Sequence, residues 1–390
     1  MHDPLAWIDQ QADAWSRKGL ERRLVAWARA TPGRLERDGR SVLNFASNDY
    51  LGLAADPRVA EAARAAAETH GWGSGASPLV SGWREPHEAL ASALAKFEGA
   101  EAVALFPSGY SANLGAIVGL VGAGDAVYLD RLNHACLVDG ARLSGAQLRV
   151  YPHDDADRLA SILARDRGRF RRSLIATDGV FSMDGDLAPL ADLADLAERF
   201  DAMLLVDEAH GTGVFGPGGR GAAAEHGVAD RVHVKVGTLS KALGSSGGFV
   251  TGSRRLIDWL LNHARTLIYS TAPPVAAAAA AHRALEISEA EPWRRSHVLE
   301  LAGSSRRLLP TLGLPDPGPG GPIIPILLGG PDRAVAVAAD LLNQGFLVPA
   351  IRPPTVPPGT ARLRISVTAG HFAEDVQGLS DALRSVLPAV

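Results

Sequence analysis

The stretch Met203–Val250 reads MLLVDEAHGTGVFGPGGRGAAAEHGVADRVHVKVGTLSKALGSSGGFV. It contains two short runs rich in aliphatic and β-branched residues, 203–206 and 232–236, and each run is closed by polar residues or glycine. Runs of this kind are typical of buried strands. Asp207 follows the first run and Lys241 lies shortly after the second. Because ligands of open α/β sheets bind outside the carboxyl ends of the strands, we expect both side chains to face one pocket.

Lysine is rare in this chain. Of the 39 lysine and arginine residues, lysine occupies only positions 18, 96, 235 and 241. A lysine kept inside a loop of glycine and serine indicates a task that arginine cannot perform, since an amine can form a Schiff base and a guanidinium cannot. Most single loop lysines are simply solvated. Lys241 is therefore informative only together with its neighbours.

Length and composition indicate an ordinary soluble globular protein. The 390 residues suffice for two domains, and the formal net charge of -4 does not favour nucleic acid or a membrane surface as a partner. The single cysteine, Cys136, excludes an intrachain disulfide and a cysteine cluster for zinc. The first ten residues lack the basic start of a signal peptide, and no apolar run is long enough to span a membrane. We therefore expect a cytoplasmic protein without a bound metal.

The order of the elements predicts an α/β fold. Strand, loop and helix recur about seven times before Gly252, a pattern typical of a mainly parallel, seven-stranded sheet covered by helices on both faces. The chain after Ser253 reads as helices followed by a small α+β region. We predict an N-terminal helical segment at 1–46, a large ligand-binding domain at 47–288 and a small C-terminal α+β domain at 289–390.

A candidate phosphate site lies in VALFPSGYSANLGAIVGLV, residues 103–121. A strand ends at Phe106, Ser108 can cap a helix, and the helix begins at Gly109 or Tyr110. The first amides of a helix are unpaired and its dipole is positive there, so such a turn can hold a phosphate. Many strand-to-helix turns carry Ser-Gly for steric reasons alone, so the pattern by itself leaves both interpretations open.

Two cofactor classes fit parts of this pattern. LLVDEAH resembles the Walker B strand of helicase-type ATPases, but those enzymes need GxxxxGK[ST], and the chain contains no Gly-Lys dipeptide. Pyridoxal phosphate needs a lysine, an anion site and a carboxylate at its ring nitrogen. Lys241, the turn at 108–110 with Thr238, and Asp207 meet these needs. At roughly 4 Å and an effective dielectric of about 20, a carboxylate and a pyridinium attract by about 4 kcal/mol, enough to keep the ring nitrogen protonated.

Eight motifs together resemble one enzyme family. SNDYLGL, GSGAS, FPSGY, DRLNHA, GVFSMDGD, VDEAHGTG, TLSKALG and YSTAPP occur in this order over nearly the whole chain. They resemble the α-oxoamine synthases, which are fold type I pyridoxal phosphate enzymes. Within that family, IRPPTVPPGTARLRIS at 351–366 is most similar to the members that condense L-alanine with a pimeloyl thioester in biotin biosynthesis, releasing carbon dioxide and the free thiol. The resemblance also implies a homodimer with shared active sites, and a pimeloyl group carried by coenzyme A or by an acyl carrier protein.

The resemblance assigns roles to individual residues. Lys241 is implied to form the Schiff base and then to act as the base on the alanine Cα. Asp207 is implied to bind the ring nitrogen, and His134 to stack on the ring near the substrate carboxylate. The implied cofactor contacts are Gly109, Tyr110, His134, Ser182, Asp207, His210, Thr238, Lys241 and, toward a neighbouring subunit, Thr271. The implied catalytic residues are Lys241, His134 and Asp207.

The implied substrate contacts are Arg22, His134, Thr355 and Arg364. A guanidinium can hold a carboxylate through two parallel hydrogen bonds, so Arg364 is expected to pair with the substrate carboxylate. The residues alone favour a surface position for Arg364 and are compatible with a turn cap for Ser182. Arg22 is one of four basic residues between positions 17 and 23.

Alternative functions stay open at this point. A sister synthase that joins glycine or serine to an acetyl, succinyl or long-chain acyl thioester would share every catalytic residue. A fold type I aminotransferase would instead release an oxo acid. A non-catalytic binding protein with the same fold would not need Lys241 or Asp207.

Overall fold

The computed structural model describes residues 3–387, so the ends of the first and last predicted domains, 1–2 and 388–390, lie outside it. The chain divides into two units. The larger unit comprises Leu51–Ser182 and Asp186–Ser296. The smaller unit comprises the described residues up to Tyr50, the segment Met183–Gly185, and the described residues from His297 onward.

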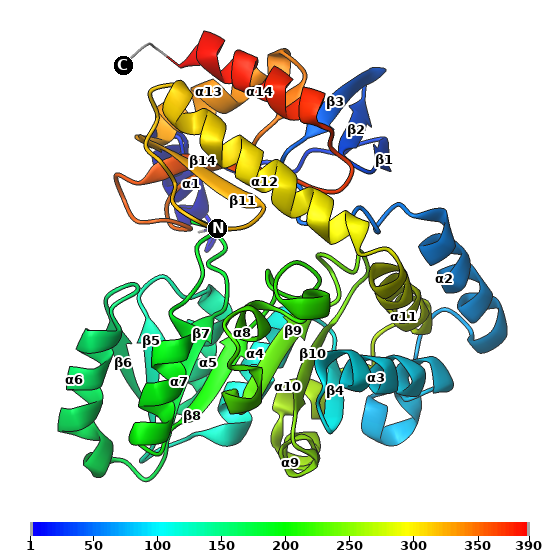
Figure 1. The fold of residues 1–390 in the computed structure, drawn as a ribbon, viewed down its shortest axis with the longest axis vertical. Helices are drawn as coiled ribbons and strands as arrows, with labels where there is room; N and C mark the ends of the chain where they lie inside the picture. The colour runs from blue at the N-terminus through cyan, green and yellow to red at the C-terminus, as the bar shows by residue number, and fades with distance from the viewer. Residues whose placement is uncertain (1–2, 388–390) are drawn as a thin grey trace. The chain divides into compact units, whose positions relative to one another are not determined.

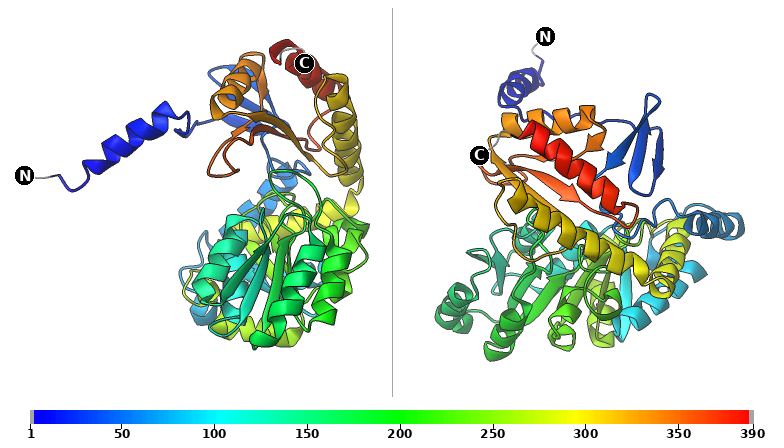
Figure 2. Two further views of the ribbon diagram at one scale, coloured as in Figure 1. Left: turned by 90° about the vertical axis from the view of Figure 1, so that its left-hand side faces the viewer. Right: turned by 45° about the horizontal axis from the view of Figure 1, so that its top comes forward.

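A seven-stranded sheet forms the centre of the larger unit. Its strands, in spatial order, are β4 (Ala102–Phe106), β10 (Gly248–Gly252), β9 (Val234–Thr238), β8 (Met203–Asp207), β7 (Ser173–Asp178), β5 (Ala126–Asp130) and β6 (Gln147–Tyr151). β10 runs antiparallel to both of its neighbours, and the pairs from β9 to β6 are parallel. Helices lie on both faces of this sheet, as Figures 1 and 2 show. The predicted fold class is therefore confirmed.

The helices of the larger unit begin where local sequence favours a start. Asp56 caps α2 by accepting a hydrogen bond from the Arg58 amide at 3.0 Å, and Pro57 occupies the first turn, where no amide is needed. The helices are α2 (Pro57–His70), α3 (Glu85–Glu98), α4 (Gly109–Leu120), α5 (Ala135–Ser144), α6 (Ala156–Asp166), α7 (Leu190–Arg199), α8 (Ala222–Glu225), α9 (Arg254–His263), α10 (Arg265–Ile268) and α11 (Val275–Ala290).

One apolar core binds the sheet to α4, α5 and α9. Phe106, Ile117, Leu137 and Leu260 are all fully buried in it. Burial of each large apolar side chain contributes about 1.5–3 kcal/mol, so this core holds the strand ends and the helix starts in place.

The smaller unit contains two sheets and three long helices. One sheet has the order β1 (Arg29–Thr31), β2 (Arg34–Arg37), β3 (Arg40–Asn44), β12 (Phe346–Leu347), and the other has the order β11 (Ile323–Gly329), β14 (Ala361–Ser366), β13 (Ala350–Ile351). The helices are α13 (Pro331–Asn343), α14 (Ala373–Val386) and α12 (Trp293–Thr311), which begins in the larger unit, and α1 (Trp7–Arg17) precedes β1.

The strands β1, β2 and β3 lie within the segment 1–46, which the sequence analysis predicts as helical. The residues of β2 are mostly charged and exposed, and β1 has only three residues, so the apolar alternation that identifies a half-buried strand is missing from both. Turns at Gly33 and at Asp38-Gly39, all three with φ between 51° and 73°, join these strands.

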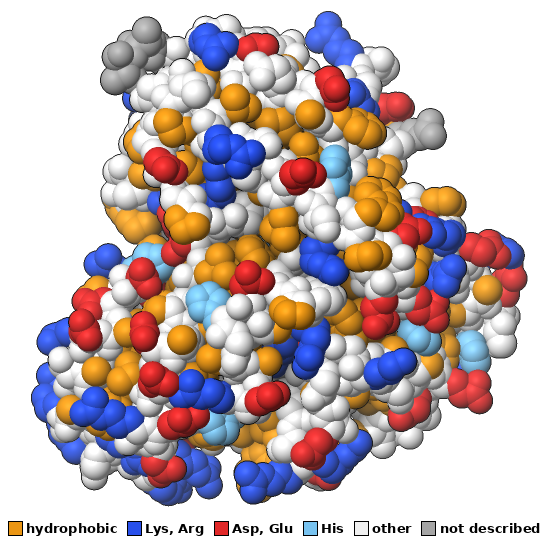
Figure 3. Space-filling view, viewed as in Figure 1, with side chains coloured by type: hydrophobic (Ala, Val, Ile, Leu, Met, Phe, Trp, Pro, Cys, Tyr) orange, Lys and Arg blue, Asp and Glu red, His pale blue; other side chains and the backbone are white. Residues whose placement is uncertain are grey.

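Basic and acidic side chains are interspersed over the face drawn in Figure 3. Among the described helices, none combines the length and the apolar character that crossing a bilayer requires.

Candidate active site

Several polar residues meet at one edge of the large sheet. β8 ends at Asp207 and β7 ends at Asp178, and these two residues are direct partners in the strand register. Gly248, the first residue of antiparallel β10, pairs with Thr238 at the end of β9 and with Phe106 at the end of β4. The carboxyl ends of β4, β7, β8 and β9 therefore lie together, where ligands of such sheets bind.

Lys241 lies three residues beyond the end of β9 and is half-buried. Its Nζ is 2.8 Å from Nε2 of His210, which is only 5% exposed. The loop that carries Lys241 turns at Gly244, where φ is +59° and a Cβ atom would come within 2.3 Å of the Ala54 amide. Only glycine fits both conditions, so the TLSKALG motif ends in glycine for a steric reason. The structure thus brings Lys241 and His210 together.

The Asp207 carboxylate is buried and held by two neutral donors. Its Oδ1 accepts a hydrogen bond from the Ala209 amide at 2.8 Å, and its Oδ2 accepts one from Asn113 Nδ2 at 2.6 Å. Asp207 is 5% exposed and Asn113 is 1% exposed. The sequence analysis missed Asn113, although it lies one helical turn beyond Gly109 in the FPSGYSAN stretch and so faces the same side of α4.

His134 is fixed by a second buried carboxylate. Its amide donates to Asp178 Oδ2 at 2.7 Å, and burial, followed by the charge of Asp207, raises the pKa of Asp178 well above its usual value. The Cys136 amide donates to His134 Nδ1 at 3.3 Å, so this ring nitrogen carries no proton. The ring of Tyr110 meets the His134 ring edge-on, with centroids 6.2 Å apart. Asp178 and Cys136 were also missed by the sequence analysis.

The start of α4 presents backbone donors at the same edge. Ser108 caps the helix, because its Oγ accepts from the Ser111 amide at 3.1 Å and its carbonyl accepts from the Ala112 amide. The amides of Gly109 and Tyr110 precede these bonds, at the helix end where the dipole favours an anion. The predicted helix start is confirmed.

Thr238 packs against this helix start. Its hydroxyl donates to the Gly247 carbonyl at 3.0 Å and lies 2.8 Å from Ser240 Oγ. A Cβ atom on Gly109 would lie 3.3 Å from Thr238 Cβ, and one on Gly248 would come within 2.5 Å of the Gly109 amide nitrogen. The glycines therefore allow β9, β10 and the start of α4 to approach one another closely.

Two other predicted cofactor contacts lie on connecting segments. Ser182 follows β7 in a loop that the bridge between Val180 and Leu187 closes. Thr271 is exposed, and the next residue, Ala272, donates its amide to the Ala76 carbonyl at 3.0 Å. The contacts of Ser182 and Thr271 with a cofactor stay predictions.

The loop that carries Ser182 is fixed by a charged histidine. His153 lies between Asp130 and Asp186, with nitrogen to oxygen distances of 3.1 and 2.9 Å. Burial alone would lower the pKa of His153, but the hydrogen bonds and charges of both carboxylates outweigh it and raise the pKa to about 10. The imidazolium therefore bridges the β5 edge and the loop near neutral pH.

Replacing His153 with glutamine should lower the free energy of unfolding by about 1–3 kcal/mol at neutral pH, because the charged bridge is lost. Since the folded pKa is raised, the bridge stabilises fully below the unfolded value of 6.5 and is lost as the pH rises toward about 10. Urea unfolding at several pH values should show that the difference in the free energy of unfolding between wild type and variant decreases as the pH rises over this range. The exposed His226→Gln serves as a control. A difference that stays constant with pH would contradict the charged bridge.

Three of the four predicted substrate residues belong to the smaller unit, and the fourth, His134, belongs to the larger one. Arg364 on β14 is 4% exposed and donates to Asn48 Oδ1 at 3.1 Å and Ser366 Oγ at 2.8 Å, so the surface position that the residues alone favoured is wrong. Arg22 is exposed and donates to the Pro353 carbonyl at 3.3 Å, two residues from Thr355. The structure thus brings Arg22 and Thr355 into one neighbourhood of this unit.

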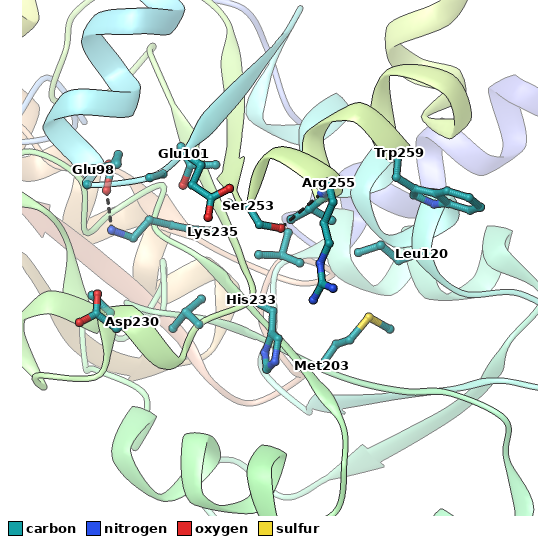
Figure 4. Close-up of a pocket in the computed structure, with 18 of the residues that line it drawn as sticks. Glu98, Glu101, Leu120, Met203, Asp230, His233, Lys235, Ser253, Arg255 and Trp259 are labelled. Atoms are coloured by element: carbon teal, nitrogen blue, oxygen red, sulfur yellow. Dashed lines mark hydrogen bonds and ion pairs between the residues drawn. The ribbon is translucent and has the colours of Figure 1, made fainter.

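A separate pocket of about 880 Å³ lies at the opposite edge of the large sheet. Met203, Val234 and Gly252, at the far ends of β8, β9 and β10, line it. Figure 4 shows this pocket, with the ion pair of Lys235 and Glu98 at one side. Asp207 lies at the other end of β8, and Lys241 lies beyond the other end of β9.

Known proteins of similar sequence and structure identify the family of this chain. The model of the aminotransferase class I and II family matches residues 40–383. A curated 8-amino-7-oxononanoate synthase from Anaeromyxobacter dehalogenans (strain 2CP-1 / ATCC BAA-258) is 50% identical over 98% of this chain and 96% of its own length. A solved serine palmitoyltransferase from Sphingomonas wittichii has a TM-score of 0.92 at 30% identity, covering 99% of this chain and 98% of that one.

A second solved structure contains the cofactor. It is a variant of a serine palmitoyltransferase from S. paucimobilis with bound PLP and myriocin, with a TM-score of 0.90 at 28% identity, covering 99% of this chain and 98% of that chain. The family match spans most of the chain, and the curated relative spans nearly all of it. This chain therefore belongs to the aminotransferase class I and II family, among the 8-amino-7-oxononanoate synthases.

Proposed function

We propose that this chain is a pyridoxal phosphate-dependent acyltransferase. It condenses L-alanine with a pimeloyl thioester to give 8-amino-7-oxononanoate, carbon dioxide and the free thiol, a step of biotin biosynthesis. The observation that carries the proposal is the pairing of Lys241 Nζ with His210 at the sheet edge where the buried Asp207 carboxylate also lies. The names of the 50% identical relatives support this choice of substrates.

The residues at this edge fit the three chemical parts of pyridoxal phosphate. The Lys241 amine suits the aldehyde, and the Gly109 and Tyr110 amides with Thr238 suit the phosphate. Asp207 accepts hydrogen bonds from two neutral donors, so its negative charge is left to pair with a protonated ring nitrogen. When bound, the cofactor supplies an electron sink that stabilises negative charge at the substrate Cα.

The chain's own side chains then position the substrate and move protons. Lys241 Nζ takes the proton from the alanine Cα, and the neighbouring His210 Nε2 holds Nζ in place at 2.8 Å. His134 is held by Asp178 and presents the flat face of its ring, so it can stack on a planar cofactor ring and keep it in position. The contacts of Arg22, Thr355 and Arg364 with substrate stay predictions.

The experiment that tests this proposal is a mass spectrum of the product. Purified protein supplied with pyridoxal phosphate, L-alanine and pimeloyl-coenzyme A should form 8-amino-7-oxononanoate with loss of carbon dioxide. Parallel reactions with pimeloyl-acyl carrier protein identify the carrier. Reactions of glycine or serine with acetyl, succinyl and palmitoyl thioesters serve as comparisons.

A sister synthase is the second candidate, because the solved structures with TM-scores of 0.90 and 0.92 are serine palmitoyltransferases. Product from serine and a long-chain thioester, with none from alanine and a pimeloyl thioester, would select it. Release of an oxo acid without carbon dioxide would select an aminotransferase instead.

A second copy of this chain is the proposed partner. The segments around the predicted intersubunit residue Thr271 expose large apolar side chains: Trp72 is 71% exposed, Val80 is 80% exposed and Tyr269 is 72% exposed. Exposed apolar groups of this size are typical of surfaces that another chain covers. Sedimentation velocity would detect the dimer, and a monomer at all concentrations would contradict it. The cytoplasmic location stays a prediction.

A further inference from the structure

Asn113 joins two parts of the candidate site that serve opposite ends of the cofactor. Its Nδ2 donates to Asp207 Oδ2 at 2.6 Å and to the Gly109 carbonyl at 3.3 Å. Asp207 is the proposed partner of the ring nitrogen, and Gly109 begins the helix proposed to hold the phosphate. Because Asn113 is 1% exposed, water does not compete for either contact.

The hydrogen bonds of Asn113 indicate that this position needs the donor group of the side chain. Among the described residues, its Oδ1 has no hydrogen-bond partner although it is buried, while both contacts of Nδ2 are made. A buried acceptor without a partner is unfavourable, so an apolar residue would be less costly if the position only needed to be filled. A cation here would neutralise Asp207, whereas the amide holds the carboxylate and leaves its charge intact.

We infer that Asn113 is a positioning residue for pyridoxal phosphate, which fixes the direction of the Asp207 carboxylate and ties it to the phosphate-binding turn. The inference rests on the proposed function, because it requires this cofactor to occupy the site. It assigns to the FPSGYSAN stretch a second task besides binding the phosphate. The link spans 94 residues of sequence between Asn113 and Asp207.

Asn113→Asp tests the inference, because it keeps the shape of the side chain and replaces the donor group with a carboxyl. Two carboxyl groups this close repel each other when both are ionised, so one keeps its proton to a higher pH than usual. The protonated form donates to Asp207 as the amide does, and the ionised form repels it. We expect the variant to bind pyridoxal phosphate nearly as wild type at about pH 6 and about 10- to 100-fold more weakly at about pH 9.

Other ionisable groups surround this contact and are the same in both proteins. They are Asp178 at the end of β7, Cys136 on α5, His134 before α5, His210 after β8 and Lys241 after β9. The ratio of the two dissociation constants at each pH therefore isolates the effect of position 113.

The measurement is equilibrium dialysis of the cofactor-free protein against pyridoxal phosphate, with no turnover involved. Asn113→Ala should weaken binding at both pH values, and Asn262→Asp, an exposed position on α9, should leave it unchanged. Equal affinity of Asn113→Asp and wild type at both pH values would overturn the inference, and so would a loss of equal size at both. A wild-type chain that does not bind the cofactor would instead overturn the proposed function.

Discussion

Replacing Lys241 with alanine is expected to lower kcat by at least about 10³-fold, because the side chain is both the attachment point for the cofactor and the proposed base on the alanine Cα. The variant should also lose the absorbance that arises when pyridoxal phosphate is covalently attached to the protein. Borohydride treatment followed by peptide mapping should label the peptide that contains Lys241 in wild type and leave it unlabelled in the variant. Activity and absorbance are measured on the same samples.

Lys96→Ala is the matched control, because Lys96 is an exposed lysine in the same unit. It should keep both the absorbance and the turnover. A Lys241→Ala protein that retained either property at the wild-type level would contradict the assignment of the amine. Wild-type protein that stayed colourless even with added pyridoxal phosphate would instead favour the non-catalytic binding protein of the same fold.

Replacing Lys235 with methionine is expected to lower the free energy of unfolding by about 3–5 kcal/mol. Lys235 Nζ lies 2.5 Å from Glu98 Oε2 and 2.5 Å from the Arg220 carbonyl, and its side chain is 8% exposed (Figure 4). Without the ammonium group, the buried carboxylate of Glu98 would lose its ion-pair partner, and only the charge of Arg220 would still offset its own. Urea unfolding of the two proteins measures the difference.

The loss of unfolding free energy in Lys235→Met should depend on pH. Burial already raises the pKa of Glu98 above its usual value, and removing Lys235 raises it further. A carboxyl whose folded pKa is raised binds its proton more tightly in the folded state, so stability falls as the pH increases above the unfolded value. The deficit of Lys235→Met should therefore be smaller near pH 5 than near pH 8.

A double replacement separates the buried charge from the loss of packing. Adding Glu98→Gln to Lys235→Met removes the unpaired charge and should recover part of the lost stability. The exposed Lys96→Met, two residues before Glu98 on α3, should have little effect. A Lys235→Met protein as stable as wild type at pH 8 would contradict the buried ion pair.

The scarcity of lysine in the sequence identifies unusual residues but does not distinguish their roles. It drew attention to Lys241, but Lys235 lies in the same stretch and is equally unusual by that criterion. Their different tasks follow from their partners: Lys235 pairs with Glu98, 137 residues away in the chain, and Lys241 meets His210, 31 residues away. Only the fold brings a carboxylate to one amine and an imidazole to the other.

The burial of Arg364 and Asp178 also depends on contacts that only the fold creates. As charged residues both would be expected at the surface, and both are less than 5% exposed. Arg364 is buried because Asn48 and Ser366 satisfy it, and Asp178 because the His134 amide does. Contacts of this kind leave no periodic trace in the sequence.

Local sequence was enough to predict the seven-stranded sheet, the helix start after Phe106, and the positions of Asp207 and Lys241 at strand ends. Each of these depends on residues that are neighbours in the chain, through apolar runs, capping residues and glycine turns. Which polar groups face those positions, above all Asn113 and Asp178 around Asp207, became apparent only in the folded chain. Hydrogen bonds between distant segments depend on strand register and helix packing, because these set which side chains meet once the chain has folded.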